Sequence, residues 1–253
     1  MFAHCAAVNE DQRNRSQREY ELAVSLYRDE RNAQSAIVAL ERALRSDPAN
    51  AEAHLLMGQL YGESGMYDRA EPFLRRAVEL FRAQAADDPE RASQYGEARN
   101  SLGAALVNLG RAAEALPMLR EVSSDVHYRA PHLALGNLGA AYLALHRDRE
   151  AVQVLERALG IRRDFCVGAY RLGEARHRIG DDEHAIEALD QALGTTAHGC
   201  DHIQAAWRLR GELRASLHQV EAARADLTRC RDLDPGSTDG RECATQLRAT
   251  EAP

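Results

Sequence analysis

Cysteine is the residue type of this chain whose positions point most directly to chemistry. Cys5 stands alone near the first residue, whereas Cys166, Cys200, Cys230 and Cys243 all lie in the C-terminal third. A thiol near a terminus can serve as an attachment point or be incidental. Four clustered cysteines permit two disulfides, which form in oxidising compartments, but they also suit free buried thiols. The cysteines alone therefore leave the compartment open.

One short segment, His198-Gly199-Cys200-Asp201-His202, resembles a metal site, because it holds three kinds of zinc ligand. A closed tetrahedral zinc site normally takes its ligands from two elements with a recognisable spacing. We therefore predict no metal and no cofactor. The sequence also lacks the HExxH, glycine-rich phosphate-loop and GxSxG motifs, so we expect no catalytic residue and no enzymatic activity.

Composition favours helices and disfavours two kinds of partner. Of the 253 residues, 45% are hydrophobic and only 5% are aromatic, and Ala, Leu, Arg and Glu dominate, which favours helix over strand. The net charge of -7 argues against nucleic-acid binding, which needs clustered positive charge. The longest apolar runs stop short of the roughly 20 residues that span a bilayer, so we predict no transmembrane helix. The residues before Cys5 are too few to form the apolar part of a signal peptide.

A repeat of roughly 34 residues organises most of the chain. When Ala51 is taken as position 1, Gly58 occupies position 8, Ala70 position 20, Leu74 position 24 and Ala77 position 27. The same arrangement of small and large residues recurs in six copies, which start at residues 17, 51, 96, 132, 166 and 204. This pattern resembles the tetratricopeptide (TPR) repeat, a pair of antiparallel helices, over residues 17 to 235.

The resemblance implies an all-α fold, a right-handed superhelical solenoid of six TPR helix pairs with a C-terminal capping helix. Gly or Ala at positions 8, 20 and 27 lets two backbones approach closely, and the large residue at position 24 fills the space between them. We divide the chain into a flexible leader at residues 1–16, repeats at 17–235, and a capping helix with tail at 236–253. Extra residues after the second copy predict a longer second helix and a turn at Asp88-Pro89.

The repeat frame makes two disulfides geometrically reasonable. Equivalent positions of neighbouring repeats lie about 10 Å apart, too far for a bridge whose Cα atoms must approach within roughly 7 Å. Cys166 and Cys200 are one repeat period apart, but Cys200 falls in an inserted segment, TTAHGCDH, that could bring it closer. Cys230 occupies position 27 of the last copy and faces the capping helix that carries Cys243. We therefore predict the bridges Cys166 to Cys200 and Cys230 to Cys243.

A helical solenoid offers its concave face to a protein partner, and positions 2, 5, 9 and 12 of each first helix point to that face. These positions are unusually apolar for a surface, and apolar grooves are typical docking sites. Neighbouring loops could cover part of such a groove. We predict a partner-binding groove formed by Leu55, Gln59, Asn100, Ala104, Val107, Leu133, Ala140, Leu143, Val167 and Tyr170.

The TPR copies, a cysteine ahead of a short polar leader, and a cysteine pair spaced by one repeat together resemble the type IV pilus pilotins, outer-membrane TPR lipoproteins of the PilF, PilW and Tgl type. The resemblance implies lipid attachment at Cys5, which would anchor the chain to the periplasmic face of the outer membrane. It further implies a non-enzymatic scaffold that binds the secretin subunit of the type IV pilus machine and assists secretin assembly and pilus-dependent motility. The alternative is a cytosolic TPR adaptor in signalling or complex assembly, with reduced cysteines.

Overall fold

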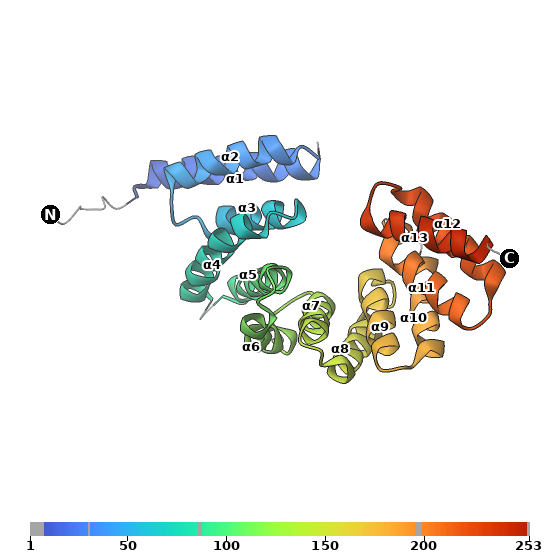
Figure 1. Cartoon of the computed structure of the whole chain (residues 1–253). Coiled ribbons are helices and arrows are strands. Elements are labelled where there is room, and N and C mark those ends of the chain that lie inside the picture. Colours follow the sequence, from blue (N-terminus) through green and yellow to red (C-terminus); the bar gives the residue numbers. More distant parts are fainter. Residues whose placement is uncertain (1–7, 30, 86–87, 196–198, 252–253) are drawn as a thin grey trace. The chain divides into compact units, whose positions relative to one another are not determined.

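The computed structural model describes residues 8–29, 31–85, 88–195 and 199–251. These residues form thirteen α-helices and one short 3₁₀ helix, and no strand is assigned among them (Figure 1). The helices are α1 (Glu10–Arg28), α2 (Ala33–Ser46), α3 (Ala51–Glu63), α4 (Tyr67–Gln84), α5 (Pro89–Asn108), α6 (Ala112–Ser123), α7 (Pro131–Ala144), α8 (Asp148–Ile161), α9 (Cys166–Arg178), α10 (Asp182–Gly194), η1 (Cys200–His202), α11 (Gln204–Ser216), α12 (Val220–Leu233) and α13 (Thr238–Glu251).

The helices fall into two compact units. The N-terminal unit runs to Arg129 and holds α1 to α6, and the C-terminal unit begins at Ala130 and holds α7 to α13. Within each unit, consecutive helices pack as pairs: α1 on α2, α3 on α4 and α5 on α6, then α7 on α8, α9 on α10 and α11 on α12 (Figure 1). The second helix of one pair also contacts the next pair, for example α4 against α5 and α8 against α9. The all-α arrangement of helix pairs with a capping helix is the one that the sequence predicted.

Glycine sets the close spacing within five of the pairs. A Cβ atom built on Gly139 would lie 2.6 Å from Leu155 Cγ, which is closer than real Cβ atoms approach a neighbour. Leu155 is fully buried, so it has no free space to move into. The same contact between positions 8 and 24 occurs in the pairs Gly58 with Leu74, Gly103 with Leu119, Gly173 with Leu189 and Gly211 with Leu227. The packing inferred from the repeat pattern is therefore present.

The leader is shorter than the sequence predicted, because α1 begins at Glu10. Asn9 and Gln12 form a capping box, in which each side chain accepts a hydrogen bond from the backbone N–H of the other, at 2.9 Å. Further along, Ser16 is fully buried and accepts a hydrogen bond from Asn50 Nδ2 at 2.9 Å. The prediction of a flexible leader up to residue 16 is therefore wrong from Glu10 onward.

The predicted insertion after the second repeat takes the form of two longer helices. As expected, α4 extends to Gln84, and Asp88 then caps the next helix with Pro89 in its first turn. The Asp88 side chain accepts hydrogen bonds from the N–H groups of Glu90 and Arg91. The helix α5 also starts earlier than the third repeat copy, which was placed at Gly96.

Candidate functional site

Both predicted disulfides are present in the C-terminal unit. Cys166, at the start of α9, is bonded to Cys200 in η1, with the Cα atoms 5.7 Å apart. Cys230 of α12 is bonded to Cys243 of α13, with the Cα atoms 6.2 Å apart. The short helix η1 lies between α10 and α11, so the inserted segment does bring Cys200 to the neighbouring repeat. The two bridges tie successive elements of this unit together.

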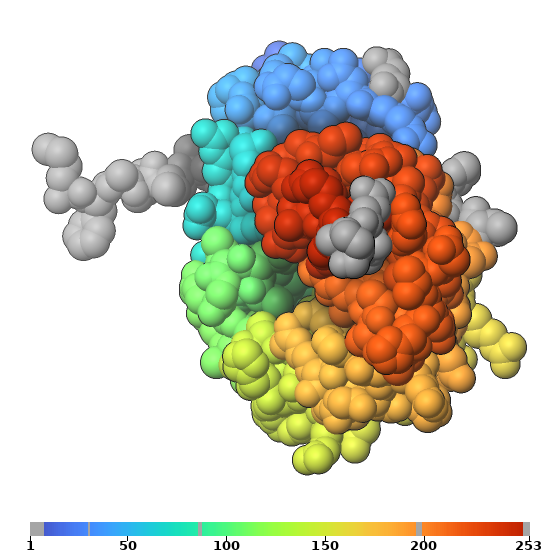
Figure 2. All heavy atoms as spheres, turned by 45° about the vertical axis from the view of Figure 1, so that its right-hand side comes forward, coloured from blue at the N-terminus to red at the C-terminus, as the bar shows by residue number. Residues whose placement is uncertain are grey.

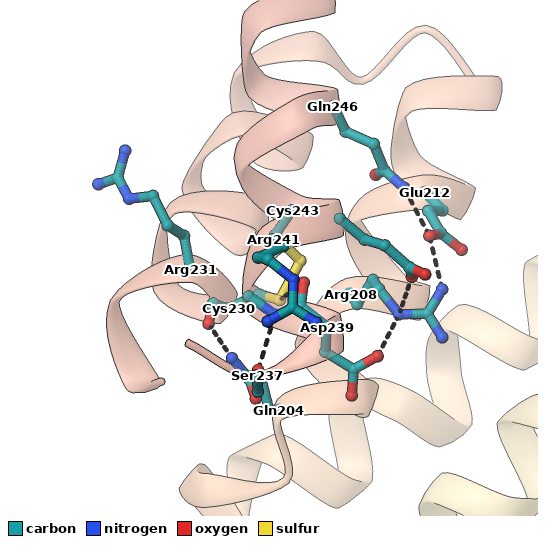
Figure 3. Close-up of a disulfide and its surroundings, with 12 residues drawn as sticks. Gln204, Arg208, Glu212, Cys230, Arg231, Ser237, Asp239, Arg241, Cys243 and Gln246 are labelled. Carbon is teal, nitrogen blue, oxygen red and sulfur yellow. Dashed lines mark hydrogen bonds and ion pairs between the residues drawn. A yellow bond between two sulfur atoms is a disulfide. The ribbon is translucent and has the colours of Figure 1, made fainter. Parts of the chain in front are cut away.

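The capping helix α13 is fixed to the last helix pair by more than its disulfide. Cys243 and Leu247 pack against Leu227 and Cys230, and Figure 2 shows α13, in the darkest red, on the outside of the C-terminal unit. Polar contacts surround the bridge (Figure 3). Gln204 Nε2 donates to the carbonyl of Cys230 at 2.7 Å, Arg208 Nε pairs with Asp239 at 2.7 Å, and Gln246 Nε2 donates to Glu212 at 2.7 Å.

The metal-like segment of the sequence does not form a metal site in the part of it that the structure describes. His198 lies outside the described residues. The sulfur of Cys200 is in a disulfide, so it is not a thiolate ligand. His202 is largely exposed, and its Nε2 atom lies 3.7 Å from Asp201 Oδ1. Cys5, the predicted lipid attachment point, also lies outside the described residues.

The first helices of the N-terminal unit enclose a pocket of about 190 Å³, which we call the α1–α3 pocket. Two predicted groove residues, Leu55 and Gln59, line it. Leu55 is only 9% exposed, so the prediction of an open side chain is wrong there. Its other lining residues are Tyr20, Val24, Tyr27, Arg28, Glu52, Leu56 and Gln94. The pocket is therefore more polar than the groove that the sequence predicted.

The phenols of this pocket are held in their neutral form. Burial, and then the charge of Glu52, raises the pKa of Tyr20. A hydrogen bond from Tyr27 to the carboxylate of Glu63 raises the pKa of Tyr27 to about 12. Neutral hydroxyl groups beside apolar side chains can both pack against and hydrogen-bond a partner.

The remaining groove positions of the N-terminal unit lie on α5. Ala104 and Val107 are half-buried, whereas Asn100 is only 5% exposed, so it does not present its side chain to a partner as predicted. The nearby Glu97 accepts hydrogen bonds from Gln59 Nε2 at 3.0 Å and from Tyr128 Oη at 2.9 Å. The sequence did not predict a role for Tyr128 at this surface. Its side chain is buried, and this burial raises the pKa of its hydroxyl group. A Cβ atom on Gly96 would come within 2.9 Å of the Tyr128 ring, so the glycine leaves room for this ring. In the sequence, Gly96 was the signal that a large side chain packs against this part of α5.

The C-terminal unit presents the rest of the predicted groove on α7 and α9. Leu133 and Ala140 are partly exposed, and Val167 is 39% exposed. Leu143 is only 5% exposed, so the prediction of an open side chain is wrong there. Tyr170 is half-buried, and burial, followed by the charge of Glu174, raises its pKa to about 12.

Part of this face is covered by side chains that the sequence analysis did not single out. The ring of Phe165 fills the space beside Gly136 and Gly168, where an added Cβ atom would meet it at 2.6 Å and 2.4 Å. Arg171 Nη1 donates to the carbonyl of Gly136 at 2.9 Å, and Arg178 Nη1 donates to that of Leu143 at 2.9 Å. In the sequence, the glycines at positions 136 and 168, both inside helices, were the signal that an aromatic ring packs against these helices. The uncovered surface thus lies at Leu133, Ala140, Val167 and Tyr170.

Three segments of the chain match models described as "Tetratricopeptide repeat", at residues 27–86, 96–124 and 134–165. The matched segments contain three of the five glycine contacts described above, Gly58 with Leu74, Gly103 with Leu119 and Gly139 with Leu155. The chain contains tetratricopeptide repeats.

The TPR protein also has a relative of known role. It is 29% identical over 133 residues to "Type IV pilus assembly protein PilF" of Pseudomonas aeruginosa, a match that covers 53% of this chain and 48% of the relative. The chain therefore matches about half the length of that relative.

Two solved structures share the fold over nearly the whole chain. The crystal structure of PilW, described as a widely conserved type IV pilus biogenesis factor, aligns with a TM-score of 0.71 and 21% identity, covering 90% of this chain and 97% of PilW. The structure titled "Functional Characterization of Pseudomonas Aeruginosa pilF" aligns with a TM-score of 0.68 and 20% identity, covering 94% of this chain and 100% of the other. At these identities the likeness shows a common TPR fold.

The TPR protein has no helix, among its described residues, that is both long enough and apolar enough to cross a bilayer. Its surface instead combines partly exposed apolar and aromatic side chains with neighbouring ion pairs. That combination is suited to holding a segment of another protein.

Proposed function

We propose that this TPR protein is a non-enzymatic scaffold of the pilotin type, which binds the secretin subunit of a type IV pilus machine and assists its assembly in the outer membrane. The observation that carries the proposal is the fold shared with PilW over 90% of the chain, together with the sequence match to PilF. A fold supports many functions, so the sequence match adds the pilus context that the fold alone would not supply.

The exposed part of the concave surface supports a binding role. In the C-terminal unit, Leu133, Ala140, Val167 and Tyr170 offer apolar and aromatic contact area next to the arginines of α9. In the N-terminal unit, the α1–α3 pocket offers two tyrosines with a guanidinium group at Arg28. Aromatic and arginine side chains contribute strongly to protein interfaces.

The two disulfides support an extracytoplasmic location. Disulfides persist in the periplasm and are rare in the cytosol, where thiols are kept reduced. We further propose that Cys5 carries the lipid that anchors the chain to the periplasmic face of the outer membrane. The four residue steps from Cys5 to the helix cap at Asn9 would make this a short tether.

The proposal is tested in cells that lack the gene and are complemented with the wild-type chain or with Cys5→Ala. The wild-type chain should label with palmitate, fractionate with the outer membrane, and restore secretin multimers and pilus-dependent motility. Cys5→Ala should lose the label and the membrane fractionation. Secretin multimers that form equally well without any copy of the gene would contradict the assembly role, and palmitate labelling of Cys5→Ala would contradict the anchor.

A further inference from the structure

A second hollow of the N-terminal unit lies between α1 and α2 and has a volume of about 400 Å³. It is lined by Gln12, Arg15, Glu19, Arg42, Arg45 and Ser46. None of these residues lines the α1–α3 pocket, so the two are separate features. We call this one the arginine hollow.

The charge of the arginine hollow is not balanced by its own residues. Arg42 Nε pairs with Glu19 Oε2 at 2.8 Å, which uses the one carboxylate of the lining. Within the described part of the chain, the guanidinium groups of Arg15 and Arg45 have no carboxylate partner, and both side chains are exposed. Two unpaired guanidinium groups facing one hollow, in a chain of net charge -7, form a local site for an anion. Guanidinium suits phosphate in particular, because its planar fork can donate two hydrogen bonds to phosphate oxygens.

The arginine hollow is close in sequence to the proposed lipid attachment point. Four Cα to Cα steps of about 3.8 Å limit the distance from Cys5 to Asn9 to roughly 15 Å. The helical rise of about 1.5 Å per residue then adds roughly 9 Å to Arg15. The capping box and the buried Ser16 hold this part of α1 in place, so it is not a loose leader. A lipid on Cys5 would therefore keep Arg15 within roughly 24 Å of the bilayer surface, a limit that allows the arginine hollow to reach a headgroup.

We propose that the arginine hollow binds the phosphate of an anionic phospholipid headgroup in the bilayer that holds the lipid anchor. The placement of the bilayer rests on the proposed function, but the charge and shape of the hollow do not. A basic patch near a lipid anchor supplies a second, electrostatic attachment to the membrane. The headgroup contact would also fix the orientation of the first helix pair against the membrane.

The test is sedimentation of the full chain carrying Cys5→Ser with vesicles, so that no attached lipid contributes. The vesicles are phosphatidylcholine alone, or phosphatidylcholine mixed with phosphatidylglycerol. The chain should bind the anionic vesicles, and the double variant Arg15→Ala with Arg45→Ala should bind them roughly 10- to 30-fold more weakly. The matched control is Arg149→Ala with Arg157→Ala, which removes two exposed arginines of α8 and should leave binding unchanged.

Equal binding to both kinds of vesicle, or binding that the Arg15 and Arg45 changes leave intact, would overturn the proposal. Binding to duplex DNA but not to vesicles, lost in the same double variant, would overturn it in favour of a nucleic-acid site. The result is separable from lipid attachment, because palmitate labelling of the wild-type chain in cells reports on Cys5 and not on the arginines.

Discussion

At the residue scale, the spacing of α7 and α8 depends on Gly139. We expect Gly139→Ala to lower the free energy of unfolding by about 1–3 kcal/mol, because its Cβ atom would overlap the buried side chain of Leu155. Gly160→Ala is the matched control on α8, since no heavy atom of the described part of the chain, outside its own helix backbone and its two neighbours, lies within 4 Å of the added Cβ position. It should be neutral or stabilising by up to about 1 kcal/mol. Urea unfolding of the two variants measures the difference, and equal effects would contradict the packing account.

His54 gives a second prediction at this scale, on the dependence of stability on pH. Its Nε2 atom lies 3.0 Å from the carbonyl oxygen of Pro48, and its Nδ1 atom is buried without a hydrogen-bond partner among the residues that the structure describes. Burial lowers the pKa of His54, so the folded state favours neutral imidazole. As the pH falls below about 6.5, the unfolded chain takes up this proton before the folded chain does, and stability is lost. Well above pH 6.5, His54 is neutral in both the folded and the unfolded chain, so it does not make the free energy of unfolding depend on pH.

The expected result is that His54→Gln loses less unfolding free energy between pH 7 and pH 5 than the wild-type chain does. Both proteins are compared by urea unfolding at the two pH values. A loss as large in His54→Gln as in the wild-type chain would exclude His54 as the source.

The sequence predicted the glycine and leucine contacts because both partners occupy fixed positions of one repeat. It did not predict that Phe165 covers Gly136, because that ring follows α8 and reaches across to α7. Phe165 stands at the end of the fourth copy, outside the positions that define the repeat pattern. The burial of Asn100 and Leu143 was missed for a related reason, since a position on the concave side can still be covered by a neighbouring helix or loop.

At the element scale, the Cys230 to Cys243 bridge determines how firmly α13 is held. We expect Cys230→Ser with Cys243→Ser to cost about 3 kcal/mol, the value typical of a disulfide that closes a loop of this size. Amide hydrogen exchange in α13 should become faster, because the packing of Leu247 and the polar contacts of Figure 3 then hold the helix without a covalent bond. Cys166→Ser with Cys200→Ser is the control, and it should leave exchange in α13 as in the wild-type chain. Unchanged exchange after loss of the Cys230 bridge would contradict this role.

The helix pairs could be predicted because each copy of the repeat carries its own packing pattern. The starts of α1 and α5 could not be read from that pattern, because both helices extend before the repeat positions begin. Their signals were local: Asn9 with Gln12 for α1, and Asp88 with Pro89 for α5. These capping residues mark the start of α1 at Glu10 and of α5 at Pro89.

At the scale of the whole molecule, the TPR fold positions binding surfaces without identifying the partner. Each unit carries its own share of partly exposed groove residues, Gln59 and Val107 in one and Val167 and Tyr170 in the other. The secretin partner is proposed from the likeness to pilus biogenesis factors, because helix pairs of this kind are used for many partners.

Direct binding of the purified chain to purified secretin subunit, measured by calorimetry, tests whether the chain binds this partner. We expect saturable binding by the wild-type chain, and at least a tenfold weakening, about 1.4 kcal/mol, for Leu133→Glu with Val167→Glu. Ile161→Glu, a change at an exposed apolar residue at the end of α8, should bind like the wild-type chain. Failure of the wild-type chain to bind, or binding that the Leu133 and Val167 changes leave intact, would contradict it.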